Sequence, residues 1–159
     1  MRLYPSTSKT DIRIAVIFIG LPKSGKTAFF HRYFSEAYSH IELSSLERRG
    51  NERAAISDCI LHGDSYVIDN ENASREDRRR YFEKARDAGY RVIGYYFEND
   101  LDTALERSGK KSDRSVRRHY TRISSRLEIP DYAEGFDELY KVDLMRNGEY
   151  SVTPMKDAR

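Results

Sequence analysis

One stretch of eight residues constrains the fold of this chain more than any other feature of its sequence. It runs from Gly20 to Thr27, reads Gly-Leu-Pro-Lys-Ser-Gly-Lys-Thr and matches the pattern G-x-x-x-x-G-K-[ST] in full. An apolar run over 12–19, interrupted only by Arg13, precedes it, and a segment with helical spacing of aromatic residues comes after it. Such a loop between a buried strand and a helix is typical of a phosphate-binding loop, or P-loop. A chance match in an ordinary strand–turn–helix is the alternative.

Each residue type in this loop has a chemical reason. Gly20 and Gly25 allow a sharp backbone turn that approaches phosphates closely, and the loop N–H groups converge on the anion at a helix N-terminus. Lys26 supplies a positive charge to the β- and γ-phosphates, and Thr27 offers its hydroxyl to Mg²⁺. Lys23 is either a further phosphate contact or a solvated lysine. The nucleotide-binding residues expected from the loop are Gly20, Leu21, Pro22, Lys23, Ser24, Gly25, Lys26 and Thr27.

Short apolar runs alternate with helical segments along the rest of the chain. The expected strands cover 12–19, 40–43, 66–69, 91–97 and 138–144. The expected helices cover 26–36, a segment from Ser44 or Ser45 to His62, 76–88, 101–108 and 112–126. This alternation predicts a three-layer α/β P-loop NTPase/kinase fold with about five parallel strands flanked by helices. Asn147-Gly148 predicts a C-terminal hairpin that returns over 150–152 as an antiparallel edge.

The length and the cysteine content suit one intracellular domain. A chain of 159 residues is expected to form a single compact domain over 11–153, with a loose arm at 1–10 and a frayed tail at 154–159. Cys59 is the only cysteine, so neither an internal disulfide nor a cysteine-rich zinc site can form. The longest apolar run is too short to cross a bilayer. We therefore expect a cytoplasmic protein without a membrane partner.

The charge is distributed unevenly although the net charge is only +2. Between Arg107 and Arg126 there are eight basic residues, and Asp113 is the only acid in that segment. A local basic segment can attract an anionic ligand. This basic segment has two interpretations, which are compatible with each other. It is either a lid together with a binding surface for a polyanion, or the solvent-exposed face of a helix.

Asp69 ends the apolar run Tyr-Val-Ile-Asp. A carboxylate at the carboxyl end of a strand beside a P-loop is where an acid associated with Mg²⁺ is expected. The alternative is a capping aspartate in the next turn.

The P-loop, together with the segment YVIDNENASREDRRRY over 66–81, resembles the kinase domain of the polynucleotide 5′-kinase family, including the polynucleotide kinase-phosphatases. The resemblance continues through RVIGYYF over 91–97, the helix with Arg107, Ile129-Pro130 and Glu134-Gly135-Phe136, and covers most of the chain from 14 to about 144. It implies an ATP- and Mg²⁺-dependent kinase that transfers the γ-phosphate to a hydroxyl, in the family the 5′-hydroxyl of DNA or RNA. GTP is the alternative donor.

The resemblance also implies roles for individual residues. Arg78 would lie near the acceptor or the phosphates, and Arg107 and Lys111 in a lid that closes over the phosphates. Lys111 stands where the family has a second arginine and lacks the planar fork of arginine, which Arg114 could replace as a nucleotide contact. The segment 69–72 would line the active site, with Asn72 on the acceptor side.

A departure from the family lies after the second strand. The family has an aspartate there that takes the proton from the attacking hydroxyl, whereas this chain has Ser44, with Glu42 or Glu47 as substitutes. A missing base can slow transfer by roughly 10²–10⁴-fold. Two alternatives to a polynucleotide kinase therefore stay open. One is a kinase with a small-molecule acceptor, and the other is a nucleotide-binding or regulatory module with weak or no transfer activity.

Overall fold

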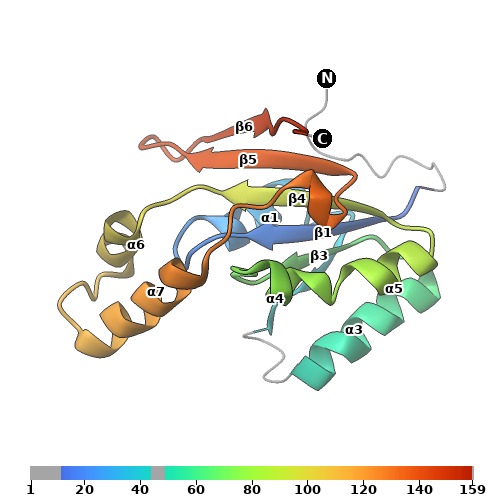
Figure 1. Cartoon of the computed structure of the whole chain (residues 1–159), viewed down its shortest axis with the longest axis horizontal. Coiled ribbons are helices and arrows are strands. Elements are labelled where there is room, and N and C mark those ends of the chain that lie inside the picture. The colour runs from blue at the N-terminus through green and yellow to red at the C-terminus, as the bar shows by residue number, and fades with distance from the viewer. Residues whose placement is uncertain (1–11, 44–48, 159) are drawn as a thin grey trace.

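A six-stranded sheet forms the centre of the protein (Figure 1). The computed structural model describes residues 12–43 and 49–158. The strands are β1 (Ile14–Ile19), β2 (Ser39–Ile41), β3 (Tyr66–Asp69), β4 (Arg91–Phe97), β5 (Glu138–Leu144) and β6 (Tyr150–Pro154). Their order is β2-β3-β1-β4-β5-β6, and only the β5–β6 pair is antiparallel. The five parallel strands and the antiparallel C-terminal edge confirm the predicted α/β fold.

Helices cover both faces of this sheet, which makes three layers. The helices are α1 (Lys26–Tyr33), α3 (Arg49–His62), α4 (Arg75–Arg79), α5 (Phe82–Asp87), α6 (Leu101–Ser108), α7 (Arg114–Arg126) and the 3-10 helix η1 (Tyr132–Glu134). One core contains Ile17, Ile56 of α3 and Phe82 of α5, and the other contains Phe18 and Phe29 of α1. Successive residues of a strand point to opposite faces. Because both faces are buried, β1 is apolar throughout.

A pair of helices stands apart from these layers. α6 and α7 lie beyond the carboxyl ends of the parallel strands, at the left of Figure 1. Asp100 caps α6 by accepting from Thr103 N, and Asp113 caps α7 by accepting from Ser115 N and Val116 N. A separate small core joins the pair to the P-loop. It consists of Leu21, Ala104, Leu105 and Tyr120, with Leu101, Val116 and Ile123 packed against it.

Three sequence predictions about these elements need correction. The helix expected over 76–88 is two helices, because Tyr81 N donates to Arg78 O in a tight turn that carries the Tyr81 side chain into the core. The helix expected over 26–36 ends at Tyr33. The tail expected from residue 154 is partly ordered, since β6 reaches Pro154 and Met155 N donates to Leu139 O. In the described parts of the chain, no helix is long and apolar enough to span a bilayer.

Candidate functional site

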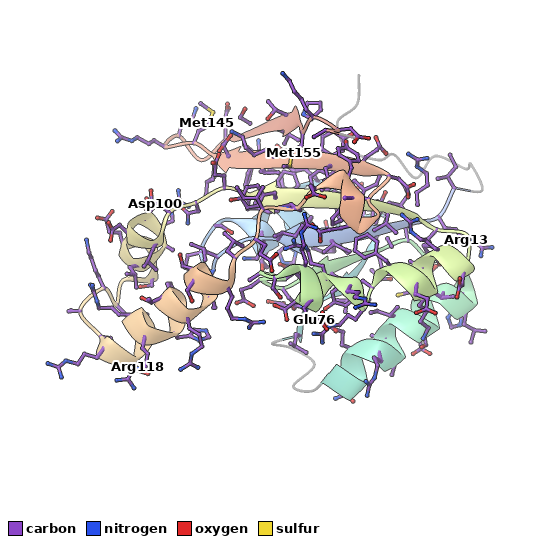
Figure 2. All side chains as sticks on the ribbon, in the orientation of Figure 1. Arg13, Glu76, Asp100, Arg118, Met145 and Met155 are labelled. Carbon is purple, nitrogen blue, oxygen red and sulfur yellow. The ribbon has the colours of Figure 1, made fainter. Side chains whose placement is uncertain are left out.

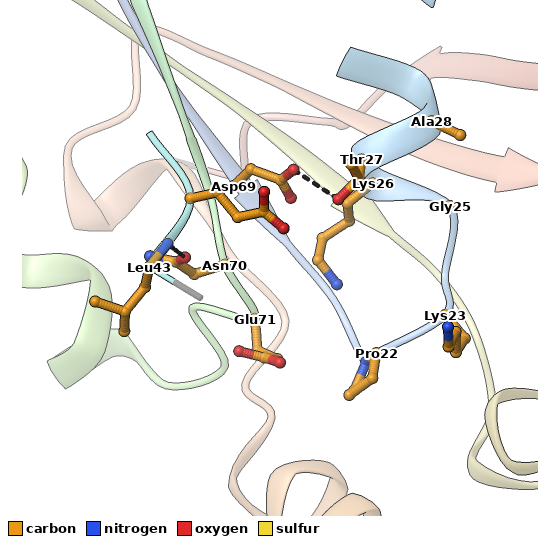
Figure 3. A pocket seen from close by; sticks show the side chains of 11 residues that line it. Pro22, Lys23, Gly25, Lys26, Thr27, Ala28, Leu43, Asp69, Asn70 and Glu71 are labelled. Atoms are coloured by element: carbon orange, nitrogen blue, oxygen red, sulfur yellow. Dashed lines mark hydrogen bonds between the residues drawn. The ribbon is translucent and has the colours of Figure 1, made fainter. Parts of the chain in front are cut away.

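A cavity of about 740 Å³ opens where the P-loop meets the carboxyl ends of β2 and β3 (Figure 3). One wall is the loop and the start of α1. The opposite wall comes from the residues just after β2 and β3. The lining residues are Pro22, Lys23, Gly25, Lys26, Thr27, Ala28, Glu42, Leu43, Asp69, Asn70 and Glu71.

Glycine is required at the two ends of the loop for steric reasons. Gly25, the N-cap of α1, has a φ of 94°, a left-handed conformation that side chains rarely adopt. A Cβ atom on Gly20 would lie 2.9 Å from the carbonyl oxygen of Phe97. Gly20 N donates to Glu71 O at 2.9 Å, which fastens the start of the loop to the segment after β3. The conformations of Gly20 and Gly25 and the hydrogen bond to Glu71 therefore fix the loop, and the first turn of α1 faces the cavity.

Lys26 is folded back onto its own loop. It is only 8% exposed, and its ammonium donates to Gly20 O at 2.8 Å, Leu21 O at 2.7 Å and Ser24 Oγ at 3.3 Å. Burial lowers the pKa of Lys26 to about 8, although the negative charges of Glu71 and Asp69 oppose the shift. A positive charge is therefore held at the cavity floor, and one of its three N–H donors, such as the one in the 3.3 Å contact to Ser24, must leave its present acceptor to bind an anion.

Asp69 and Thr27 form an oxygen pair beside this lysine. The parallel pairing of β1 with β3 sets Asp69 opposite Phe18, so the carboxylate lies next to the start of α1. Thr27 Oγ1 donates to Asp69 Oδ2 at 2.8 Å, and His40 Nε2 lies 2.7 Å from the same oxygen. A hydroxyl and a carboxylate are hard oxygen ligands of the kind that Mg²⁺ accepts together with substrate phosphates. The side chains present therefore fit the expected metal.

The wall opposite the loop is acidic and polar. Glu42 and Glu71 line it, and Leu43 N donates to Asn70 Oδ1 at 2.8 Å. Ser44, expected on the acceptor side, lies outside the described residues.

Two predicted site residues have structural roles instead. Asn72 is 4% exposed, and its side-chain amide donates to Phe18 O at 2.7 Å, so it fixes the turn after β3 rather than facing an acceptor. Arg78 is 0% exposed. Its guanidinium donates to both carboxylate oxygens of Glu134, at 2.8 and 3.0 Å, and to the carbonyl oxygens of Asn72 and Ala73. Four of its five N–H donors are used and its side chain is fully buried, so Arg78 does not contact the cavity in this structure.

The three predicted lid residues lie on or between α6 and α7. Arg107 reaches the P-loop, where its Nη1 donates to Lys23 O at 3.1 Å. Lys111 is exposed and pairs with Glu106 at 3.3 Å. Arg114 is exposed at the start of α7. All three lie outside the set of described residues that line the cavity.

Sequence patterns missed His40 and did not single out Asn70 or Glu71 within the segment 69–72 that was expected at the site. His40 is not part of any sequence spacing typical of metal ligands. Only the pairing of β2 with β3 brings its side chain next to Asp69. Asn70 and Glu71 lie in the segment expected at the site, but their orientation toward the cavity depends on the turn that Asn72 holds. The only sequence feature that indicated a place in the site for Asn70 and Glu71 was their position directly after Asp69.

The fold has clear counterparts among solved structures. Mycobacterium tuberculosis APS kinase, in complex with AMPPNP and APS, has a TM-score of 0.61 at 17% identity over 85% of this chain and 90% of that chain. Chaetomium thermophilum Kti12, in complex with ADP-AlF3, gives 0.57 at 17% identity over 81% and 88%. A gluconokinase from Sinorhizobium meliloti gives 0.53 at 17% identity over 85% and 85%.

No family model matches the sequence, and no curated protein matches it. At these identities the structural likeness establishes the fold alone. The chain has the α/β fold of P-loop kinases.

Proposed function

We propose that this protein is a Mg²⁺-dependent phosphotransferase that moves the γ-phosphate of ATP, with GTP as the alternative donor, to a hydroxyl of a small molecule. The observation that carries the proposal is the meeting of Lys26 with the Thr27–Asp69 pair in one cavity. The acceptor would bind on the other side of the cavity, against the wall formed by the residues that follow β2 and β3. Cavities of this volume are in the range that holds a cofactor-sized ligand.

On the donor side, the chain binds and neutralises the phosphates. The loop N–H groups and the N-terminus of α1 receive the phosphate oxygens. Lys26 turns an N–H donor from Ser24 toward the phosphates, and Thr27 and Asp69 would hold the metal. Bound Mg²⁺ would supply neutralisation of the charge that develops on the transferred group. Arg107, already at the loop, is the lid residue best placed to contact the phosphates.

On the acceptor side, the charge favours a small acceptor over a polynucleotide. Glu42 and Glu71 line this wall, and their carboxylates would repel further phosphate groups held close to it. A compound that presents a hydroxyl without an adjacent negative charge meets no such repulsion. Two of the proteins with this fold, a gluconokinase and an APS kinase bound to AMPPNP and APS, are named for compounds of small size, which supports the same direction.

A polynucleotide 5′-hydroxyl acceptor is the second candidate, and one observation favours it. The outer side of α7 is basic and exposed, and Arg118 projects from it away from the sheet (Figure 2). An exposed row of arginines can contact successive groups of a phosphate backbone. This surface is on the same helix pair as Arg107, so a strand bound there could reach the cavity.

The test is transfer of label from γ-labelled ATP to a panel of sugars, sugar acids and nucleosides, and in parallel to 5′-hydroxyl DNA and RNA. Lys26→Ala is expected to abolish transfer, whereas the matched change Lys156→Ala at the exposed C-terminal end is expected to leave it intact. Label on a small compound supports the proposal, and label on the oligonucleotides alone supports the second candidate. ATP binding without transfer to any acceptor would overturn both in favour of a nucleotide-binding module.

A further inference from the structure

The acceptor wall of the cavity depends on one side-chain amide. Asn70 comes directly after Asp69, lines the cavity and is 8% exposed. Its Oδ1 accepts from Leu43 N at 2.8 Å, which links the end of β2 to the end of β3. Leu43 and its neighbour Glu42 both line the cavity, so this single bond helps to set how far their wall stands from the phosphate-binding loop.

The orientation of that amide is imposed from behind the cavity. Asn70 Nδ2 donates at 2.8 Å to Oε2 of Glu52, a residue of α3 that is 1% exposed. A carboxylate can only accept hydrogen bonds, whereas an amide has one accepting and one donating end. Glu52 therefore requires Nδ2 to face α3, and Oδ1 must then face Leu43. A rotation of the amide by 180° would set two donors against each other at Leu43 and two acceptors at Glu52.

Glu52 is itself fixed. Tyr81, 5% exposed, donates its hydroxyl to Oε1 of Glu52 at 3.1 Å, so each carboxylate oxygen has a defined partner. Glu52 also lies in the first turn of α3, where the helix dipole stabilises a negative charge. The carboxylate is thus held between α3 and the turn that separates α4 from α5.

We infer that Glu52 is a positioning residue for the acceptor side: through Asn70 it holds residues 42 and 43, which follow β2, at a fixed place opposite the P-loop. The inference rests on the proposed function for its effect on transfer. The chain of contacts from Tyr81 through Glu52 and Asn70 to Leu43 stands on the structure alone. No contact in this chain involves the P-loop, so its loss should change acceptor use and leave nucleotide binding unchanged.

The test compares four variants of the full-length protein. Glu52→Leu removes both acceptors, Glu52→Gln keeps one acceptor for Asn70, and Tyr81→Phe removes only the second anchor. Tyr90→Phe is the matched control, because its buried hydroxyl donates to the carbonyl oxygens of Cys59 and Asp64, outside this chain of contacts. Tyr81→Phe and Glu52→Gln keep the test decisive if Glu52→Leu does not fold.

The first readout is hydrogen exchange at the Leu43 amide, measured by NMR without nucleotide. Loss of a hydrogen bond of ordinary strength corresponds to exchange about tenfold faster in Glu52→Leu. We expect a smaller increase in Tyr81→Phe, little change in Glu52→Gln and none in Tyr90→Phe. Unchanged Leu43 exchange in both Glu52→Leu and Tyr81→Phe, or in Tyr81→Phe alone when Glu52→Leu is unfolded, would overturn the inference.

The second readout separates positioning from general destabilisation. With an acceptor found in the panel, or with water as acceptor where ATP is only hydrolysed, Glu52→Leu should raise the acceptor KM or lower the turnover about tenfold. The Kd for MgATP should stay the same. An equal loss of MgATP affinity would show a merely structural role and overturn the inference. A parent protein with normal Leu43 protection but no turnover of ATP would instead count against the proposed function.

Discussion

The lowered pKa of Lys26 makes a specific prediction about nucleotide binding. Burial in the nucleotide-free protein lowers this pKa from 10.5 to about 8. Phosphate oxygens around the ammonium will raise it back toward its ordinary value of 10.5, because opposite charges favour the charged form. Between these two values the bound protein holds one proton more than the free protein, so binding must take up a proton and weaken as the pH rises.

The size of the effect can be worked out from the free-state pKa. With a pKa of about 8, roughly one-tenth of Lys26 is neutral at pH 7 and roughly nine-tenths at pH 9. The Kd for MgATP should therefore increase about tenfold between pH 7 and pH 9, with proton uptake on binding rising from about 0.1 to about 0.9. The nucleotide adds little to this change, since the second pKa of a phosphate lies near 6.

Isothermal titration at both pH values, in two buffers of different ionisation enthalpy, measures the Kd and the proton uptake together. Lys26→Arg is the control, because a guanidinium stays charged over this range and should bind with a Kd that does not depend on pH. A parent protein with the same Kd at pH 7 and pH 9 and no proton uptake would refute the reasoning. So would a Lys26→Arg variant that keeps the tenfold change.

Three further predictions concern the core and the metal site. Gly94→Ala should lower the free energy of unfolding by about 1–3 kcal/mol in urea, since its Cβ would lie 2.6 Å from Leu139 Cδ2, whereas Gly50→Ala in open space should not destabilise. Arg78→Met should cost about 3–5 kcal/mol in the same assay by leaving a buried carboxylate unpaired, and leave the MgATP affinity of the folded fraction intact. Asp69→Asn should remove the dependence of nucleotide binding on Mg²⁺ in titrations with and without the metal, and an unchanged dependence would exclude Asp69 as a ligand.

The layers of the fold could be predicted from the sequence because their signals are local. A buried parallel strand is apolar on both faces, and the P-loop motif itself requires a strand before it and a helix after it. The bounds predicted for β3, β4, β5 and α6 are those observed. The break between α4 and α5 could not be predicted in this way. No glycine or proline marks it, and Tyr81 leaves the helix for a hydrogen bond to Glu52, which is 29 residues away in the sequence.

The candidate site was likewise predictable only where its signals are local. Lys26, Thr27 and Asp69 were placed together because a motif and the end of an adjacent strand define them. The place predicted for Arg78, near the acceptor or the phosphates, differs from its buried place in the structure for a physical reason. A cluster of arginines in a sequence does not reveal which one is buried, and the carboxylate that pairs with Arg78 lies 56 residues further along the chain.

The most direct test of the proposed nucleotide site is a crystal structure with a non-hydrolysable ATP analogue and Mn²⁺, whose anomalous signal locates the metal. We expect the metal at Thr27 Oγ1 and the Asp69 carboxylate, directly or through water. We also expect the Lys26 ammonium to lie within hydrogen-bond distance of the phosphate oxygens. Phosphates bound elsewhere, or a Lys26 ammonium out of hydrogen-bond reach of them, would contradict the proposed donor site.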